Sequence, residues 1–248
     1  MKIRRFKIDK KFICGQEAFL QDPGEIRHIR NVLRMKAGDP VILFDGEGLE
    51  YAATIQSVSS AKISLALSSS PEQGAAESPL RLILGLGILK SSKFDWVLQK
   101  ATELGVTEIV PFYSLRVVPH VEGRKISLRQ NRWEKIAAEA AKQCGRAKVP
   151  RVHPPLSFAE VLSLETGDAT RILLWEEERA GGMQDLRHRE GSSFFVLVGP
   201  EGGFSAEEAS QAQKAGFYSL RLGPRILRAE TAALAIIAWL QFSFGDLK

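Results

Sequence analysis

The stretch Gly199-Pro200-Glu201-Gly202-Gly203 decides how the C-terminal part of this chain is expected to fold. It follows the apolar run 194–198, which predicts a buried strand, and it precedes Ser205-Ala206-Glu207-Glu208, the Ser-x-x-Glu pattern of a helix capping box. Its glycines let the backbone approach a ligand closely, because no Cβ atom intervenes. The stretch therefore predicts either a plain strand-to-helix turn or a ligand loop at the end of a strand.

A second loop of this kind spans Leu222-Gly223-Pro224-Arg225-Ile226-Leu227-Arg228-Ala229-Glu230-Thr231. It follows a predicted strand at 218–222 and leads into an apolar helix predicted at 232–240, which Thr231 is expected to cap. Charges beside a buried helix are costly unless they are paired or used. The charged residues of this loop therefore indicate a functional site, with an internal Arg228–Glu230 ion pair or an exposed arginine pair as alternatives.

The composition is that of an ordinary soluble globular protein, with 44% hydrophobic and 25% charged residues. A net charge of +5 is a weak indication of a polyanionic partner. Cys14, Cys144 and the histidines show no metal-ligand spacing, so no metal site is predicted. The longest apolar run is too short to span a membrane, and the N-terminus lacks the apolar core of a signal peptide. We therefore expect a cytoplasmic protein without membrane contact.

The sequence divides into a β-rich module, a linker and an α/β domain. Residues 1–68 contain two predicted strands, 41–44 and 51–58, around a glycine-containing turn, and thus a hairpin. Residues 69–79 are small, polar and bracketed by prolines, which predicts the linker. Residues 80–248 open with strand, helix and strand patterns. This predicts a mainly parallel sheet whose functional edge lies at the carboxyl ends of its strands.

Basic side chains gather at two places in the β-rich module. A helix predicted at 25–35 leaves Arg27, Arg30 and Arg34 off its apolar face, and the N-terminal stretch contributes Arg4 and Arg5. A solvated helix face is the alternative interpretation. Two basic stretches on one small module nevertheless favour contact with a phosphate backbone.

The two loops together, with Gly-Pro-Glu-Gly-Gly-Phe at 199–204 and Leu-Gly-x-x-Ile-Leu-Arg-x-Glu-Thr-Ala at 222–232, resemble the bacterial 16S ribosomal RNA methyltransferases that make N3-methyluridine, a family of the SPOUT superfamily. The resemblance runs through the whole chain. It implies a PUA-like β-barrel at 1–68 and an α/β methyltransferase domain with a deep trefoil knot at 80–248. It also implies small-subunit ribosomal RNA as partner and a homodimer formed through the C-terminal domain.

Group transfer from a bound carrier fits the remaining chemistry, because the sequence has neither a P-loop nor a Gly-x-Ser-x-Gly nucleophile elbow. The resemblance implies S-adenosylmethionine as the carrier. The residues expected to bind it are Leu174, Gly199, Gly202, Gly203, Leu222, Gly223, Ile226, Leu227 and Thr231.

Several side chains are expected to contact RNA. Lys90 and Arg116 follow predicted strand ends, although Leu115, which precedes Arg116, departs from the pattern of the family. The segment Glu139-Ala140-x-x-Gln143-x-x-Arg146 matches a segment of the family. The full expected set is Arg4, Arg5, Arg27, Arg30, Arg34, Lys90, Arg116, Gln143 and Arg146.

Uracil N3 carries a proton at neutral pH, so its methylation needs a base or strong stabilisation of the anion. We expect Glu201 or Glu230 to assist proton removal and Arg228 to stabilise charge on the uracil carbonyls. A structural Arg228–Glu230 pair is the alternative. At the level of function, the alternatives are a superfamily enzyme with another RNA target and an RNA-binding assembly factor without catalysis.

Overall fold

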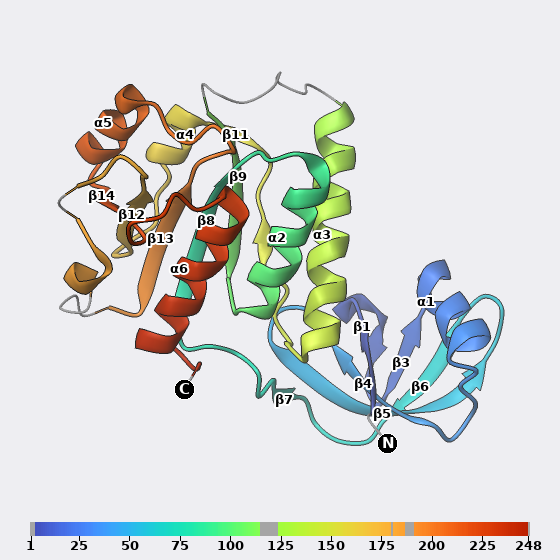
Figure 1. Ribbon diagram of the computed structural model, residues 1–248. Helices are drawn as coiled ribbons and strands as arrows, with labels where there is room; N and C mark the ends of the chain where they lie inside the picture. The colour runs from blue at the N-terminus through green and yellow to red at the C-terminus, as the bar shows by residue number, and fades with distance from the viewer. Residues whose placement is uncertain (1–2, 115–123, 180, 187–190, 248) are drawn as a thin grey trace. The chain divides into compact units, whose positions relative to one another are not determined.

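The computed structural model describes residues 3–114, 124–179, 181–186 and 191–247. The chain forms two compact units, which are described separately (Figure 1). Unit 1 consists of residues 1–77 and 141–149, and unit 2 of residues 78–140 and 150–248.

Unit 1 is built on a mostly antiparallel sheet with the strand order β1-β4-β5-β6-β3-β2, and β7 pairs with β5. The strands are β1 (Arg4–Lys7), β2 (Ile13–Cys14), β3 (Glu17–Leu20), β4 (Pro40–Phe44), β5 (Leu49–Val58), β6 (Ile63–Leu67) and β7 (Glu72–Gln73). The predicted hairpin is confirmed, since β4 and β5 pair antiparallel. Its turn is held by the Asp45 carboxylate, which accepts backbone N–H groups of Glu47 and Gly48 at 2.7 and 2.9 Å.

The helical segment of unit 1 differs in form from the expected single helix. A 3-10 turn, η1 (Lys10–Phe12), precedes it; α1 (Pro23–Arg27) then begins behind the N-cap Asp22 and continues as a π-helical turn, η2 (His28–Val32). The start moves toward the N-terminus because the Asp22 carboxylate accepts the Glu25 N–H at 2.9 Å. Ile26 and Ile29 are buried in the core of the unit, whereas Arg27, Arg30 and Arg34 are exposed, as predicted.

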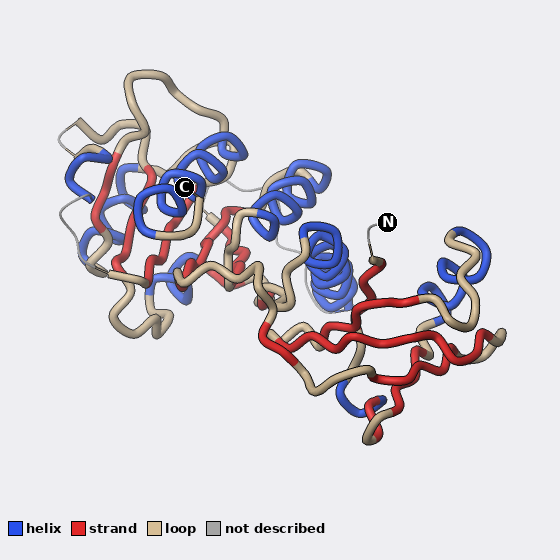
Figure 2. Tube along the Cα trace, turned by 90° about the horizontal axis from the view of Figure 1, so that it is seen from below, coloured by secondary structure: helices blue, strands red, loops and turns tan. Residues whose placement is uncertain are grey.

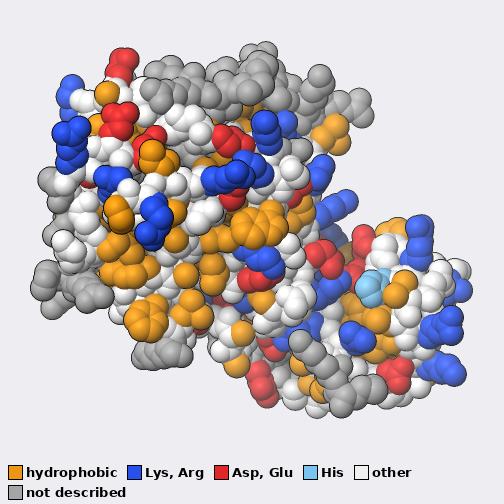
Figure 3. All heavy atoms as spheres, viewed as in Figure 1, with side chains coloured by type: hydrophobic (Ala, Val, Ile, Leu, Met, Phe, Trp, Pro, Cys, Tyr) orange, Lys and Arg blue, Asp and Glu red, His pale blue; other side chains and the backbone are white. Residues whose placement is uncertain are grey.

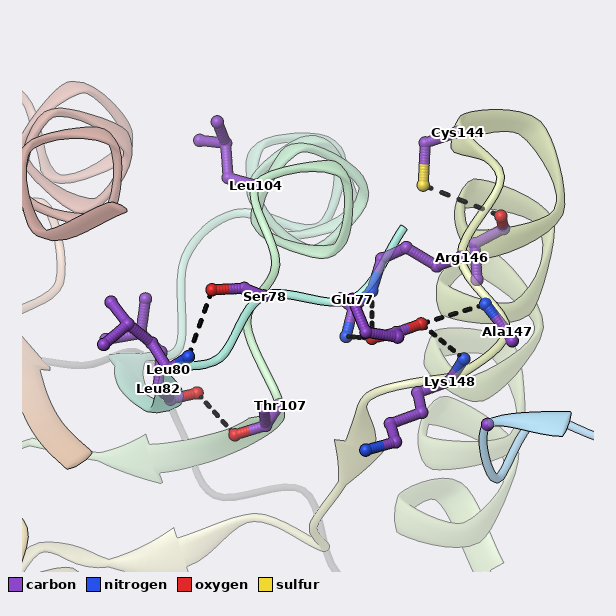
Figure 4. Close-up of polar contacts among 12 residues, drawn as sticks. Glu77, Ser78, Leu80, Leu82, Leu104, Thr107, Cys144, Arg146, Ala147 and Lys148 are labelled. Carbon is purple, nitrogen blue, oxygen red and sulfur yellow. Dashed lines mark hydrogen bonds and ion pairs between the residues drawn. The ribbon is translucent and has the colours of Figure 1, made fainter. Parts of the chain in front are cut away.

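The segment predicted as a linker also contributes to unit 1. It contains β7 and Glu77, whose carboxylate binds the segment that follows α3 (Arg124–Cys144) (Figure 4). One Glu77 oxygen accepts the backbone N–H groups of Ala147 and Lys148 at 2.9 and 2.7 Å. The other accepts the Arg146 guanidinium at 3.1 Å. Because Arg146 is only 3% exposed, this charged pair is an internal contact of the unit.

Unit 2 is built on a parallel sheet with the order β10-β9-β8-β13-β12-β14, and β11 pairs with β9. The strands are β8 (Arg81–Gly87), β9 (Glu108–Tyr113), β10 (Arg151–Val152), β11 (Leu156–Ser157), β12 (Thr170–Leu174), β13 (Ser193–Val198) and β14 (Tyr218–Leu220). The parallel pairing of β8 with β9 confirms the predicted strand-helix-strand unit. Every residue of β13 is buried, because helices cover both faces of the sheet.

The helices of unit 2 lie in two layers (Figures 1 and 2). They are α2 (Ser91–Glu103), α4 (Phe158–Leu162), α5 (Ala206–Lys214) and α6 (Ala229–Phe244), with a 3-10 turn η3 (Met183–Leu186). α6 packs against α2, β8 and β13 on one face. On the other face, side chains of α4 and α5 share a core cluster with Ile83, Phe112 and Phe195 of the sheet. α3 joins the first layer, since Trp133 lies 4.4 Å from Phe94 between ring centroids.

The last part of the chain takes an unusual route. β14 pairs with β12 on the side away from β13, yet the helix that follows β14 packs on β13 and β8. The chain must therefore return past the carboxyl end of β12. Residues 181–182 lie against this return segment: the Arg221 N–H donates to the Gly181 carbonyl at 3.1 Å.

Glu108, Arg81 and His153 form a cluster of ionisable side chains at the other end of the sheet. A hydrogen bond with His153 at 3.0 Å, together with one from Arg81 at 2.9 Å, outweighs burial and lowers the pKa of Glu108 to about 2. Because this folded pKa lies below the ordinary 4.5, the ionised carboxylate stabilises the fold above pH 4.5, and that contribution is lost as the pH falls toward about 2.

We expect Glu108→Gln to lower the free energy of unfolding by about 1–2 kcal/mol at pH 7. The difference from the unmodified protein should shrink between pH 4.5 and pH 2. Urea unfolding at pH 7 and at about pH 3 measures it. Glu103→Gln, which removes an i,i+3 pair with Lys100, is the control and should change stability by less than about 0.5 kcal/mol. A Glu108→Gln deficit that is the same at both pH values would contradict the assignment.

Candidate active site

The two loops singled out in the sequence line one cavity of about 290 Å³ in unit 2. It lies at the carboxyl ends of β12, β13 and β14, where ligands bind in open α/β sheets. Its volume is close to that of small-ligand pockets. Of the residues expected to bind a cofactor, it is lined by Leu174, Gly199, Gly203, Leu222, Ile226 and Leu227. Gly202, Gly223 and Thr231 are not among its lining residues.

The loop after β13 is compact because its glycines have no side chains. The Gly203 N–H donates to the Pro200 carbonyl at 2.9 Å, and Gly203 has a φ of +66°. A methyl group at Gly203 would overlap the Glu176 carboxylate. A Cβ atom at Gly87, the end of β8, would lie 2.6 Å from the Pro200 nitrogen. The loop is then followed by α5, whose predicted Ser205–Glu208 capping box is confirmed.

The loop after β14 turns at Gly223, which has a φ of +75°. The Arg221 guanidinium donates to the Pro224 carbonyl at 2.6 Å and closes this turn. The expectation that Thr231 caps the following helix is wrong. α6 already begins at Ala229, its N-cap residue is Arg228 without a capping side-chain bond, and Thr231 lies inside the first turn.

Two carboxylates of the expected catalytic set meet at a lysine that the sequence analysis did not identify. The Lys93 ammonium lies 3.7 Å from a Glu201 oxygen and 3.4 Å from a Glu230 oxygen. The same Glu201 oxygen accepts the Lys90 backbone N–H at 3.3 Å. Lys93 lies in the first turn of α2 and lines the cavity. Its position just beyond the end of β8 is the signal that could have identified it, as it identified Lys90.

The recorded partner of Glu230 is thus Lys93. An Arg228–Glu230 ion pair does not occur among the ion pairs of the described residues. Arg228 is exposed and lines the cavity, as does Arg225. Between them, Ile226 is 78% exposed, which is unusual for a large apolar side chain. The rim of the cavity therefore offers two guanidinium groups and an apolar side chain to a ligand.

Two further residues of the cavity come from the segment after β12. Trp175 and Glu176 both line it, and the Trp175 indole nitrogen is buried without a hydrogen-bond partner in the described part of the chain. The Glu176 carboxylate lies beside Gly203. This carboxylate provides acceptors for hydroxyl or ammonium groups of a bound molecule.

Most of the residues expected to contact RNA are exposed, whereas two of them bind partners within unit 1. Arg4, Arg27, Arg30 and Arg34 are exposed in unit 1, whose visible face carries many Lys and Arg side chains (Figure 3). Gln143 in unit 1 and Lys90 in unit 2 are exposed as well. Arg116 lies outside the described residues.

Arg5 and Arg146 are the exceptions to this exposure. The Arg5 guanidinium donates to Glu50 at 2.8 Å and to the Arg146 carbonyl at 3.1 Å. The Arg146 guanidinium is buried against Glu77. Both guanidinium groups thus bind partners within unit 1, which makes them poor candidates for direct contact with RNA.

The described residues contain no group of three or more His, Cys, Asp or Glu side chains that could hold a metal ion. Over the same residues, no helix has the length and apolar character required to cross a membrane.

The chain matches two family models, and the residues that line the cavity lie within the first of the two matched ranges. Residues 76–241 match the RNA methyltransferase domain, and residues 20–67 match the RNA methyltransferase PUA domain. The ribosomal RNA small subunit methyltransferase E of Bacillus subtilis is 34% identical over 88% of this chain and 87% of its own. The protein of the same name from Buchnera aphidicola of Acyrthosiphon pisum is 33% identical over 100% of this chain and 96% of its own.

Solved structures agree in fold over the whole chain. The ribosomal RNA small subunit methyltransferase E of Neisseria gonorrhoeae, bound to S-adenosylmethionine, has a TM-score of 0.90 at 34% identity, with 100% of both chains covered. A methyltransferase of Legionella pneumophila, also in complex with this cofactor, has a TM-score of 0.90 at 30% identity. The fold thus comprises a PUA-like domain and a methyltransferase domain, and the chain belongs to the RNA methyltransferase family that includes the ribosomal RNA small subunit methyltransferase E proteins.

Proposed function

We propose that the chain transfers the methyl group of S-adenosylmethionine to N3 of a uridine in the 16S ribosomal RNA of the small ribosomal subunit. The observation that carries the proposal is the glycine-built cavity at the carboxyl ends of the unit 2 strands, in a chain of this family. The names of its relatives and the cofactor in two similar structures support it.

The residues of the cavity fit this cofactor. Leu174, Ile226 and Leu227 offer apolar contacts, and the backbones of Gly199 and Gly203 allow close approach. The Glu176 carboxylate can accept hydrogen bonds from hydroxyl groups. When bound, S-adenosylmethionine supplies a methyl group activated by a sulfonium centre.

The charged groups around the cavity fit the needs of the target atom. Uracil N3 must lose its proton, and a carboxylate of the Glu201–Lys93–Glu230 cluster would accept it. Arg228 on the rim can stabilise the charge that develops on the uracil carbonyls. Both roles rely on positioning rather than on a nucleophilic side chain of the protein.

The RNA partner follows from the target atom and from the exposed cations. N3 lies on the Watson–Crick edge, so the uridine must be unpaired or extruded from a helix. We assign binding of the phosphate backbone to a PUA-like β-barrel at 1–68, through Arg4, Arg27, Arg30 and Arg34. Residues 69–79 connect it to the methyltransferase domain at 80–248, and the protein acts in the cytoplasm.

Two finer features of the domain are part of the proposal. The return of the chain past β12, with residues 181–182 against the return segment, supports a deep trefoil knot of the SPOUT type. Apolar side chains that lie on the surface over α6, with Phe242 exposed, support a homodimer through this domain (Figure 3).

The activity is tested with labelled S-adenosylmethionine and small ribosomal subunits from cells that lack the modification. We expect transfer of the label and, after nuclease digestion, N3-methyluridine as the labelled nucleoside. Label in another nucleoside would favour a different RNA target within the superfamily. Tight subunit binding without any transfer would favour an assembly factor.

The cofactor site is tested at Gly203. We expect Gly203→Ala to weaken cofactor binding at least tenfold in calorimetry, because the methyl group would displace the Glu176 carboxylate, an acceptor that lines the cavity. Gly167→Ala is the matched control: Gly167 has nearly the same φ, +64°, but no neighbouring atom within 4 Å and no place in the cavity. Equal losses in both variants would show that backbone strain alone is responsible, and would contradict this cavity as the cofactor site.

A further inference from the structure

Lys93 is the one cation that joins the two carboxylates of the expected catalytic set among the ion pairs of the described residues. The three groups come from three separate places: the first turn of α2, the loop after β13 and the first turn of α6. Since one ammonium lies within 3.7 Å of Glu201 and 3.4 Å of Glu230, the two acids are held close together. Without the lysine, like charges would oppose this arrangement.

The two carboxylates differ in their access to a substrate. The Glu230 side chain is 16% exposed; one of its oxygens faces Lys93, and the other is buried without a hydrogen-bond partner in the described structure. The Glu201 side chain is 34% exposed, and Glu201 lines the cavity, whereas Glu230 does not. A general base must come within hydrogen-bond distance of the proton that it removes. Glu201 meets this condition better than Glu230.

We propose that Glu201 is the proton acceptor, that Lys93 is a positioning residue that holds it at the cavity, and that Glu230 anchors Lys93. This inference rests on the proposed methyl transfer and assigns separate roles within it. In the reaction, Glu201 takes the N3 proton and the N3 electron pair forms the bond to the methyl carbon. The electron pair of the broken carbon–sulfur bond stays on sulfur, so charge and atoms balance.

The geometry explains how the lysine acts through its neighbours. The Glu201 oxygen that faces Lys93 also accepts the Lys90 N–H, the N-cap group of α2. One hydrogen bond and one ion pair from the start of α2 thus hold a single carboxylate oxygen, which leaves the second Glu201 oxygen for the substrate. Glu230 holds the same ammonium at 3.4 Å, and its place in the first turn of α6 suits a carboxylate.

A partly buried ion pair on the same helix provides the matched control. Lys100 of α2 pairs with Glu103 at 2.8 Å and has a similar exposure, but it does not line the cavity. Lys100→Met therefore removes the same charge from the same helix without touching the cluster. A general loss of helix stability or of net positive charge would affect both variants alike.

The test measures single-turnover transfer of total labelled methyl to bound subunits, with cofactor affinity by calorimetry and thermal unfolding as parallel readouts. We expect Glu201→Gln to slow transfer at least about a hundredfold. Lys93→Met and Glu230→Gln should each slow it about tenfold or more, and the double variant should be no slower than Lys93→Met, because both act through Glu201. Lys93→Arg should restore most of the rate, while Lys100→Met stays within about twofold of the unmodified enzyme.

The inference is overturned if Lys93→Met transfers as fast as Lys100→Met, or if Glu230→Gln is slow while Glu201→Gln keeps the full rate. Cofactor affinity offers a readout that does not depend on transfer. Lys93→Met should weaken binding several-fold relative to Lys100→Met, because the loop at 199–203 loses its tether, and equal affinities in these two variants also count against the inference. The nucleoside that carries the label tests the proposed N3 target separately, because the rate ratios can be read from total label.

Discussion

The close approach of backbone segments at the carboxyl end of the unit 2 sheet is the constraint on which the site depends. Pro200 packs against the end of β8 only because Gly87 has no side chain, and Gly199 lies directly beside Gly203 in the turn. The positive φ of Gly203 then directs the chain into α5. A side chain at Gly87 would collide with the Pro200 backbone, and one at Gly203 would displace the Glu176 carboxylate, so the glycines fix the wall of the cavity before any charged residue is considered.

The positions of the charged residues depend on this wall of the cavity. Because β8, β12, β13 and β14 all run parallel, the segments that leave their carboxyl ends meet at one edge, however far apart they are in the sequence. Lys93, Glu201 and Glu230 therefore meet although they belong to three segments. The ion cluster stabilises the loop that the glycines allow. Neither feature alone would place a carboxylate at the cavity.

Sequence patterns predicted local structure well and long-range contacts poorly. The hairpin of β4 and β5, the capping box at Ser205 and the parallel pairing of β8 with β9 follow from periodicity and caps, which are local properties. The partner of Glu230 could not be found in this way, because a neighbouring arginine in the sequence is the obvious choice, whereas the fold brings Lys93 from another helix. The cap at Thr231 failed for a related reason: a helix can begin without a side-chain cap when its first turn is packed.

The arginines also show that long-range contacts cannot be predicted from sequence patterns. Arg4 and Arg5 are adjacent and look equivalent in the sequence, yet alternation along β1 leaves Arg4 exposed and directs Arg5 to Glu50. Arg146 is predicted from the sequence to contact RNA, but its guanidinium binds Glu77, a residue of the predicted linker. A count of basic residues thus overestimates the surface that can bind a polyanion. The partners of each guanidinium decide which of them remain available.

The loop at 221–228 joins the two requirements of the proposed reaction in one short segment. Leu222 and Leu227 line the cavity and are partly buried, while Arg225, Ile226 and Arg228 extend to its exposed rim. Gly223 and the bond from Arg221 to Pro224 make this turn compact, so the inner and the outer side chains belong to one short segment. The proposed cofactor contacts and the proposed RNA contacts of this loop therefore share one turn at the carboxyl end of the sheet.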